Sequence, residues 1–117
     1  STEDAYLLPG YDFLIDDGDA FRVGELTVRA LLTPGHTPGS LCFTVDNEPV
    51  VFSGDTLFPG GPGTTRLPGG DFETIIQSID DRLFSLPTDT FVLPGHGLDT
   101  TIGAERPHLQ EWVDRGW

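Results

Sequence analysis

The chain has 117 residues and a formal net charge of −13, because nineteen acidic residues stand against six arginines and no lysine. This length favours a single domain over residues 1–117, with enough chain to bury one hydrophobic core. The absence of lysine excludes enzymes that depend on a phosphate-loop lysine, a pyridoxal Schiff base or a kinase ATP-site lysine. The acidic charge argues against nucleic acid and anionic membrane as partners, since both require a basic face.

Two further features bear on the cellular compartment. No apolar run approaches the roughly 20 residues of a membrane-spanning helix. The single cysteine, Cys42, cannot form an intramolecular disulfide and stands in an apolar run. We expect it to be a buried, inert thiol rather than a nucleophile. The sequence is therefore typical of a cytoplasmic protein in a reducing environment.

Glycine and proline divide the first half of the chain into short elements. Residues 1–8 predict a short helix, and the Asp-Asp-Gly-Asp run at 16–19 predicts a turn. A β-hairpin follows, with strands at 21–23 and 26–32 around Gly24-Glu25. Two more strands are predicted at 40–45 and 49–53, joined by a turn at 46–48.

The second half alternates between loop, helix and strand. Residues 59–70 are rich in glycine and proline and predict a loop. Asp71 is a good N-cap for a helix whose apolar side chains recur at helical spacing. A strand at 90–93 and a short last helix follow, and Leu109, Trp112 and Val113 form the apolar stripe of that helix. The order of elements predicts an α/β sandwich unit.

Three segments of this chain share one pattern, in which an apolar strand is followed by a glycine and then by a side chain that can bind a metal. The three side chains are His36, Asp55 and His96. Ligands at several strand ends can converge on one edge of a sheet. Two imidazoles and a carboxylate suit Zn, Fe or Mn better than a hard cation such as Ca²⁺. The recurrence of the pattern favours a metal site over three unrelated turns.

Other chemistries have less support in the sequence. A Ser-His-Asp triad could use Ser40 or Ser53, but no spacing selects either serine, and the Gly-x-Ser-x-Gly motif is absent. His108 follows a proline on a polar helix face, and we expect it to be a surface residue with at most a role at the mouth of the site.

The three ligand-type residues stand within the motifs TPGHTPGS at 33–40, SGDTLF at 53–58 and PGHG at 94–97, and TTIGAE follows at 100–105. In this order the motifs resemble those of the metallo-β-lactamase-fold hydrolases, on their glyoxalase II-like branch. The resemblance implies an αβ/βα sandwich with a site for one or two metal ions, Zn first and Fe or Mn as alternatives. It implies that His36 binds the first metal, that His96 binds the second, and that Asp55 bridges them.

The chain departs from the family pattern in two places. The family signature His-x-His-x-Asp-His is absent, and the chain has only three histidines. We therefore expect it to be the C-terminal portion of such a sandwich, within a longer protein. The glycine-rich loop also differs, because Thr64 stands where many relatives have Arg, and Arg66 where they have Asp. The contacts that this loop makes in relatives cannot be assumed here.

The resemblance implies a hydrolase in which a metal-activated hydroxide attacks a small-molecule ester or thioester, such as a glutathione thioester. With two protein ligands for each metal, the chain by itself is expected to bind metal weakly and to be inactive. We expect it to self-associate or to pair with the missing N-terminal portion. Two alternatives stay open: a mononuclear-iron persulfide dioxygenase, and a non-catalytic acidic interaction module.

Overall fold

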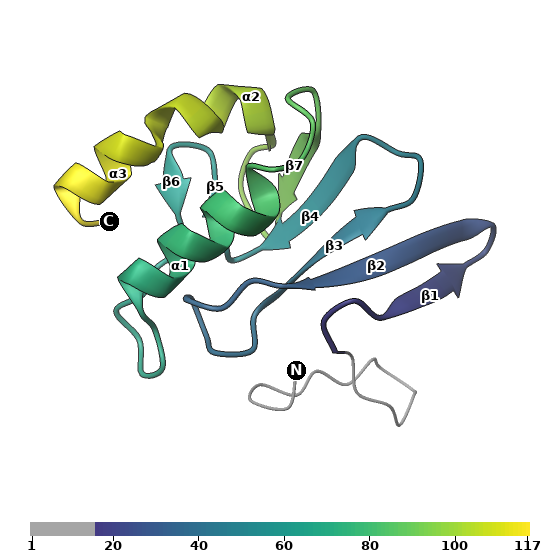
Figure 1. Cartoon of the computed structure of the whole chain (residues 1–117), viewed down its shortest axis with the longest axis horizontal. Helices are drawn as coiled ribbons and strands as arrows, with labels where there is room; N and C mark the ends of the chain where they lie inside the picture. Colours follow the sequence, from purple (N-terminus) through teal and green to yellow (C-terminus); the bar gives the residue numbers. More distant parts are fainter. Residues whose placement is uncertain (1–15) are drawn as a thin grey trace.

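The computed structural model describes residues 16–117, and the helix predicted at 1–8 lies outside this range. Its main feature is a six-stranded sheet in the order β1-β2-β3-β4-β7-β8 (Figure 1). The predicted hairpin and the predicted strands at 40–45, 49–53 and 90–93 are all confirmed, with shifts of one residue at their ends. The strands are β1 (Ala20–Val23), β2 (Leu26–Leu32), β3 (Leu41–Val45), β4 (Val50–Gly54), β7 (Phe91–Pro94) and β8 (Thr100–Thr101).

The strand directions explain where a site can form. Neighbouring strands are antiparallel except for β4 and β7, which are parallel. Since β3 is antiparallel to both β2 and β4, the strands β2, β4 and β7 run in the same direction. Their carboxyl ends therefore lie at one edge of the sheet, where α/β folds place their sites.

The helices follow the predicted positions, apart from a π-helical turn at the end of the first helix and an additional short helix before the last one. Asp71 caps α1 (Phe72–Ser78) as predicted, because its carboxylate accepts the backbone N–H of Thr74 at 3.0 Å. The helix then widens into the π-helical turn η1 (Ile79–Leu83), which the apolar spacing did not indicate. The chain ends with α2 (Ile102–Glu105), the 3₁₀ turn η2 (Arg106–His108) and α3 (Leu109–Arg115).

The hydrophobic core lies between the helices and one face of the sheet. Along β3, β4 and β7, the side chains that point to this face alternate with those that point away. Trp112 of α3 is 1% exposed and packs on Phe84, with 6.0 Å between the ring centroids. The buried members of this core are Cys42, Val51, Leu57, Ile75, Ile79, Leu83, Phe84, Val92, Ile102 and Trp112.

The other face of the sheet is apolar and partly exposed. We call Phe43, Phe52, Phe91 and Leu93 the open face, because they alternate with the buried core residues of the same strands. Phe52 pairs with Phe43 on one side and with Leu93 on the other. The side chains of Phe52 and Phe91 are 43% and 55% exposed. None of the helices described for residues 16–117 lies on this face, since they pack on the opposite one.

Two expectations need correction, and two short elements were not predicted. Residues Gly61–Pro62 were expected in a loop but form strand β6, which pairs with β5 (Leu57–Phe58) in a two-stranded hairpin. Such a two-residue strand depends on its partner and has no periodicity of its own. Val113, expected on the apolar stripe of the last helix, is 43% exposed, so only Trp112 and Leu109 of that stripe face the core. The short β8 and α2 were not predicted as elements.

Within the part of the chain that the structure describes, no helix is long and apolar enough to cross a membrane. The cytoplasmic location stays a prediction.

Candidate metal centre

The three predicted ligand residues come together at the shared carboxyl edge of β2, β4 and β7. His36 lies in the turn after β2, Asp55 follows β4 directly, and His96 follows β7 after one glycine. The turn before His36 requires Gly35, whose φ is +140° and whose missing Cβ would lie 2.2 Å from the Cβ of Ile75 in α1. Only glycine allows the ligand turn to approach the helix this closely.

Asp55 lies between the two imidazoles. Its Oδ2 is 3.6 Å from Nε2 of His36, and its Oδ1 is 3.6 Å from Nδ1 of His96. Both distances are too long for a hydrogen bond. A tetrahedral zinc ion with nitrogen at roughly 2.0–2.1 Å and oxygen at roughly 2.0–2.2 Å holds those two atoms about 3.4 Å apart. The donor set and its spacing therefore fit a carboxylate that binds one metal ion through each of its oxygens.

The loop after β6 fixes the orientation of His36. Its Nδ1 lies 2.7 Å from the backbone carbonyl oxygen of Thr64. A carbonyl can only accept, so Nδ1 donates to it, and Nε2 is the ring nitrogen that faces Asp55. Metal-binding histidines in proteins commonly have such a carbonyl partner on the other nitrogen.

His96 is the most exposed of the three residues, with a side chain that is 77% exposed, against 50% for Asp55 and 18% for His36. One side of its ring packs on Phe58 of β5, with 4.9 Å between the centroids. The small β5–β6 hairpin therefore supports His96 by this contact.

A buried hydroxyl pair joins the two ligand turns beneath the site. Thr33 precedes the His36 turn and Thr56 follows Asp55, and their hydroxyl oxygens are 3.2 Å apart. Both residues are at most 1% exposed. The hydroxyl of Thr33 also lies 3.2 Å from the Cys42 sulfur. The contact between Thr33 and Thr56 therefore ties the turn that carries His36 to the turn that carries Asp55.

The alternatives to a metal site lose support. The hydroxyl of Ser53 is buried and donates to the carbonyl of Leu57 at 2.7 Å, so it cannot act as a nucleophile. Ser40 is 6% exposed, and its hydroxyl accepts the backbone N–H of Thr37. Cys42 is fully buried as predicted, and this burial raises its thiol pKa to about 11. His108 is exposed and pairs with Glu111 at 3.1 Å.

The centre is incomplete within residues 16–117. Among these residues, no group of three His, Cys, Asp or Glu side chains is arranged to hold one metal ion. His36 with Asp55, and Asp55 with His96, give two candidate half-sites, each with two potential ligands. Catalytic zinc sites usually have three protein ligands and a water.

Comparison with known proteins assigns the family. The sequence profile of the Metallo-beta-lactamase superfamily matches residues 3–96. The chain belongs to this superfamily. The resemblance read from the three motifs is confirmed, and so is the α/β fold class.

The superfamily relatives include proteins whose names indicate different activities. The chain is 43% identical over 95 residues to the "Probable metallo-hydrolase YqgX" of Bacillus subtilis, which covers 81% of the chain and 45% of that relative. It is 40% identical over 105 residues to "Hydroxyacylglutathione hydrolase GloC" of Haemophilus influenzae, and the match covers 85% of this chain and 50% of that relative. It is 35% identical over 85 residues to the human "Persulfide dioxygenase ETHE1, mitochondrial", and the match covers 73% of this chain and 34% of that relative.

Solved structures of superfamily members agree with the fold. The BLEG-1 B3 metallo-beta-lactamase superposes with a TM-score of 0.77 at 41% identity, over 83% of this chain and 46% of that one. TTHA1623, in a di-iron-bound form, gives a TM-score of 0.69 at 40% identity, over 86% and 47%. The chain spans about half the length of the relatives that it matches.

The structure brings the three predicted residues together at one edge, but sequence reasoning did not identify the groups that support them. The Thr64 contact uses a backbone carbonyl, which no side-chain pattern can reveal. The Thr33–Thr56 pair and the Phe58 contact depend on which turns lie side by side. The only available signal was that Thr33, Thr56 and Phe58 stand inside the motifs that carry the ligands.

Proposed function

We propose that this superfamily member is part of a metal-dependent hydrolase that cleaves a small-molecule thioester, with a glutathione thioester as the leading substrate. The observation that supports this most strongly is the carboxylate of Asp55, which presents a different oxygen to each of two imidazoles. Hydrolysis of an acyl thioester requires an activated water and stabilisation of an oxyanion. The relative named as a hydroxyacylglutathione hydrolase supports the substrate class.

Zinc is the proposed metal, with iron or manganese as alternatives. His36 and Asp55 would hold one ion, and Asp55 and His96 the other. When bound, the metal supplies Lewis acidity that lowers the pKa of water toward neutrality and polarises the substrate carbonyl. The chain contributes the orientation: the Thr64 carbonyl keeps Nε2 of His36 toward Asp55, and Phe58 packs against His96.

We further propose that the open face pairs with a sheet layer equivalent to the N-terminal half of the longer relatives. Two observations support this partner: the chain spans about half of those relatives, and each half-site has only two protein ligands. A partner layer that brings further His or Asp ligands would cover the open face and complete the site. Burying aromatic side chains such as Phe52 and Phe91 would provide the association energy.

The pairing can be tested with the N-terminal half of the Bacillus subtilis relative and light scattering. We expect a one-to-one complex, and we expect Phe52→Asp to abolish it. Val113→Asp is the matched control, because Val113 is also 43% exposed but lies on α3, on the other side of the sheet. A chain that stays monomeric in the presence of this half, or one that pairs only with a second copy of itself, contradicts the proposed partner.

The hydrolase function is tested on the same complex. The complex is loaded with zinc, and thiol release from S-lactoylglutathione is followed. We expect turnover only when both halves and zinc are present, and we expect Asp55→Asn to abolish it. A stable, zinc-loaded complex that releases no thiol contradicts the hydrolase and favours the non-catalytic module.

A persulfide dioxygenase is the second candidate function, and the human relative of that name supports it. It uses a single iron ion, which would be held by His36 and Asp55 without a need for His96. Oxygen uptake with glutathione persulfide by the iron-loaded complex, unaffected by His96→Ala, favours the dioxygenase. Thioester cleavage that is lost in His96→Ala favours the hydrolase.

A further inference from the structure

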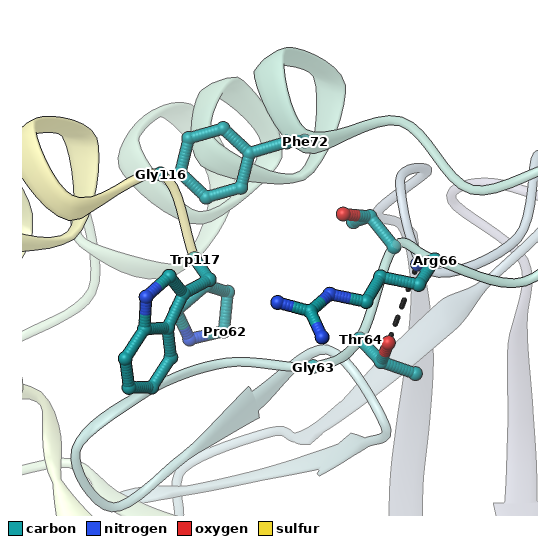
Figure 2. Close-up of a pocket in the computed structure, with 8 residues that line it drawn as sticks. Pro62, Gly63, Thr64, Arg66, Phe72, Gly116 and Trp117 are labelled. Carbon is teal, nitrogen blue, oxygen red and sulfur yellow. Dashed lines mark hydrogen bonds between the residues drawn. The ribbon is translucent and has the colours of Figure 1, made fainter.

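A pocket of about 490 Å³ lies next to the candidate metal centre, between the loop after β6 and the C-terminal end of the chain. It is within the range of small-molecule sites in proteins. Aromatic and polar groups both contribute to its walls (Figure 2). The lining residues are Pro62, Gly63, Thr64, Thr65, Arg66, Phe72, Gly116 and Trp117.

The pocket wall and the metal centre share one stretch of backbone. Thr64 lines the pocket, and its carbonyl oxygen lies 2.7 Å from Nδ1 of His36. Gly63, also in the wall, packs so tightly on Asp55 that an added Cβ would lie 1.7 Å from the Asp55 carbonyl oxygen. The pocket and the edge where His36 and Asp55 meet are therefore neighbours that share the backbone of Gly63 and Thr64.

The charge of the pocket is opposite to that of the chain. The chain has nineteen acidic residues, yet the lining contains Arg66 and no Asp or Glu. Figure 2 shows the guanidinium of Arg66 extending into the space between Phe72 and Pro62. The positive charge of Arg66 in this pocket can attract and hold an anionic group.

Arg66 also has a free guanidinium. Within residues 16–117, the structure gives it no ion pair or side-chain hydrogen bond, and only its backbone N–H is bonded, to the Thr64 hydroxyl at 3.3 Å. Four other arginines have partners, which are Asp46 for Arg29, Asp17 for Arg82, Leu86 and Thr88 for Arg106, and Gly60 for Arg115. Arg22 on β1 also has no side-chain partner among residues 16–117, but it lies outside the lining of this pocket.

We propose that Arg66 selects substrates that carry a carboxylate, which it binds while the adjoining apolar part lies between Phe72 and Trp117. A guanidinium pairs with a carboxylate through two parallel N–H donors, which gives strength and direction. This assignment rests on the proposed function, because it concerns the non-reacting part of the thioester. Within the loop at 59–70, Arg66 is the one cationic side chain.

The test measures binding to the 117-residue chain without metal, so it does not depend on hydrolysis. The probes are 4-phenylbutyrate and its neutral match 4-phenylbutanamide, followed by fluorescence of Trp117, which lines the pocket and is 61% exposed. We expect the carboxylate to bind at least tenfold more tightly than the amide. Arg66→Gln should reduce this ratio to near one while leaving the thermal unfolding of the chain unchanged.

Arg22→Gln is the matched control, because it removes the same charge from an exposed site on β1 and should leave the ratio intact. Equal binding of the two probes, or an equal effect of both variants, overturns the proposal. Competition by inorganic phosphate at the same concentration as the carboxylate also overturns it, because the site would then bind any anion. If the ratio holds but the assembled complex cleaves no thioester, the proposed function fails and the carboxylate pocket stands.

Discussion

The Nδ1 atom of His36 lies 2.7 Å from the carbonyl oxygen of Thr64, which joins the first ligand turn to the loop that lines the neighbouring pocket. The contact places a proton on the side of the ring that faces away from Asp55. It also couples the position of the loop to that of the ligand. The metal centre and the proposed substrate pocket are therefore joined through Thr64.

Removing Asp55 should weaken metal binding at both half-sites, because it is the only carboxylate that they share. We expect the unpartnered chain to bind Zn²⁺ weakly, and we expect Asp55→Asn to reduce that affinity by at least about tenfold, as loss of a direct ligand should cost no less than loss of a supporting group. A calorimetric titration measures both values.

The control for this change is Asp46→Asn, which removes the same charge from a carboxylate that pairs with Arg29 at 2.7 Å, away from the site. Its zinc affinity should equal that of the unaltered chain. Unchanged binding in Asp55→Asn contradicts the assignment of this ligand. Tight, stoichiometric zinc binding by a verified monomer contradicts the incompleteness of the site.

Gly63 and Gly95 flank Asp55 but differ in the space that they leave. A Cβ at Gly63 would lie 1.7 Å from the Asp55 carbonyl oxygen, whereas at Gly95 the nearest atom is 3.5 Å away. We expect Gly63→Ala to lower the free energy of unfolding by about 1–3 kcal/mol through overpacking. Gly95→Ala should change it by less than about 0.5 kcal/mol. Urea unfolding measures both, and equal effects would contradict the packing described here.

The buried Cys42 thiol predicts a loss of stability at alkaline pH. Burial raises its pKa from 9.0 to about 11 in the folded chain, so the folded state keeps a proton that the unfolded state releases. The contribution of the protonated thiol to the free energy of unfolding is fully present below pH 9, and it is lost as the pH rises to about 11. The expected loss is about 2–3 kcal/mol.

Unfolding by urea at pH 8, 9, 10 and 11 measures this slope, and Cys42→Ala isolates it from the titration of other groups. The variant should be less stable at pH 8 but should lose less stability on going to pH 11. In the native chain at pH 8, the thiol should also resist alkylation by iodoacetamide. Parallel slopes for the two proteins, or rapid alkylation, would show that the thiol is not buried.

Glu105 should matter for stability although it lies outside the metal centre. It is 6% exposed, and its carboxylate accepts the backbone N–H of Gly60 at 2.8 Å and the hydroxyl of Thr100 at 2.7 Å. Glu105→Gln replaces the charged carboxylate with a neutral amide that has one acceptor oxygen, so the Thr100 hydroxyl must turn to accept from the amide NH₂. The loss of the charge-assisted bonds should cost about 1–3 kcal/mol. Glu111→Gln, on an exposed residue, should cost less than about 0.5 kcal/mol. Thermal unfolding that ranks the two variants equally would contradict this.

Local chemistry made much of the fold predictable. The Gly24-Glu25 turn between alternating strands, the Asp71 cap and the strand ends with glycine each depend on neighbours in the sequence. The apolar spacing carries no signal for the π-helical turn. The β5–β6 hairpin was not predictable, because Gly61 of β6 packs close to Arg115 and Trp112 of α3, which lie far along the chain. Gly61, for example, stands in a glycine-rich run that by itself predicts a loop.

For the site, the sequence by itself determined which side chains could bind a metal and that each follows an apolar strand, because ligand chemistry and strand periodicity are local properties. Tertiary structure decided that His36, Asp55 and His96 meet, because the parallel pairing of β4 with β7 aligns strand ends that lie about forty residues apart in the chain. It also decided what surrounds them. The Thr64 carbonyl, the buried Thr33–Thr56 pair and the free guanidinium of Arg66 acquire their roles only where separate loops come into contact.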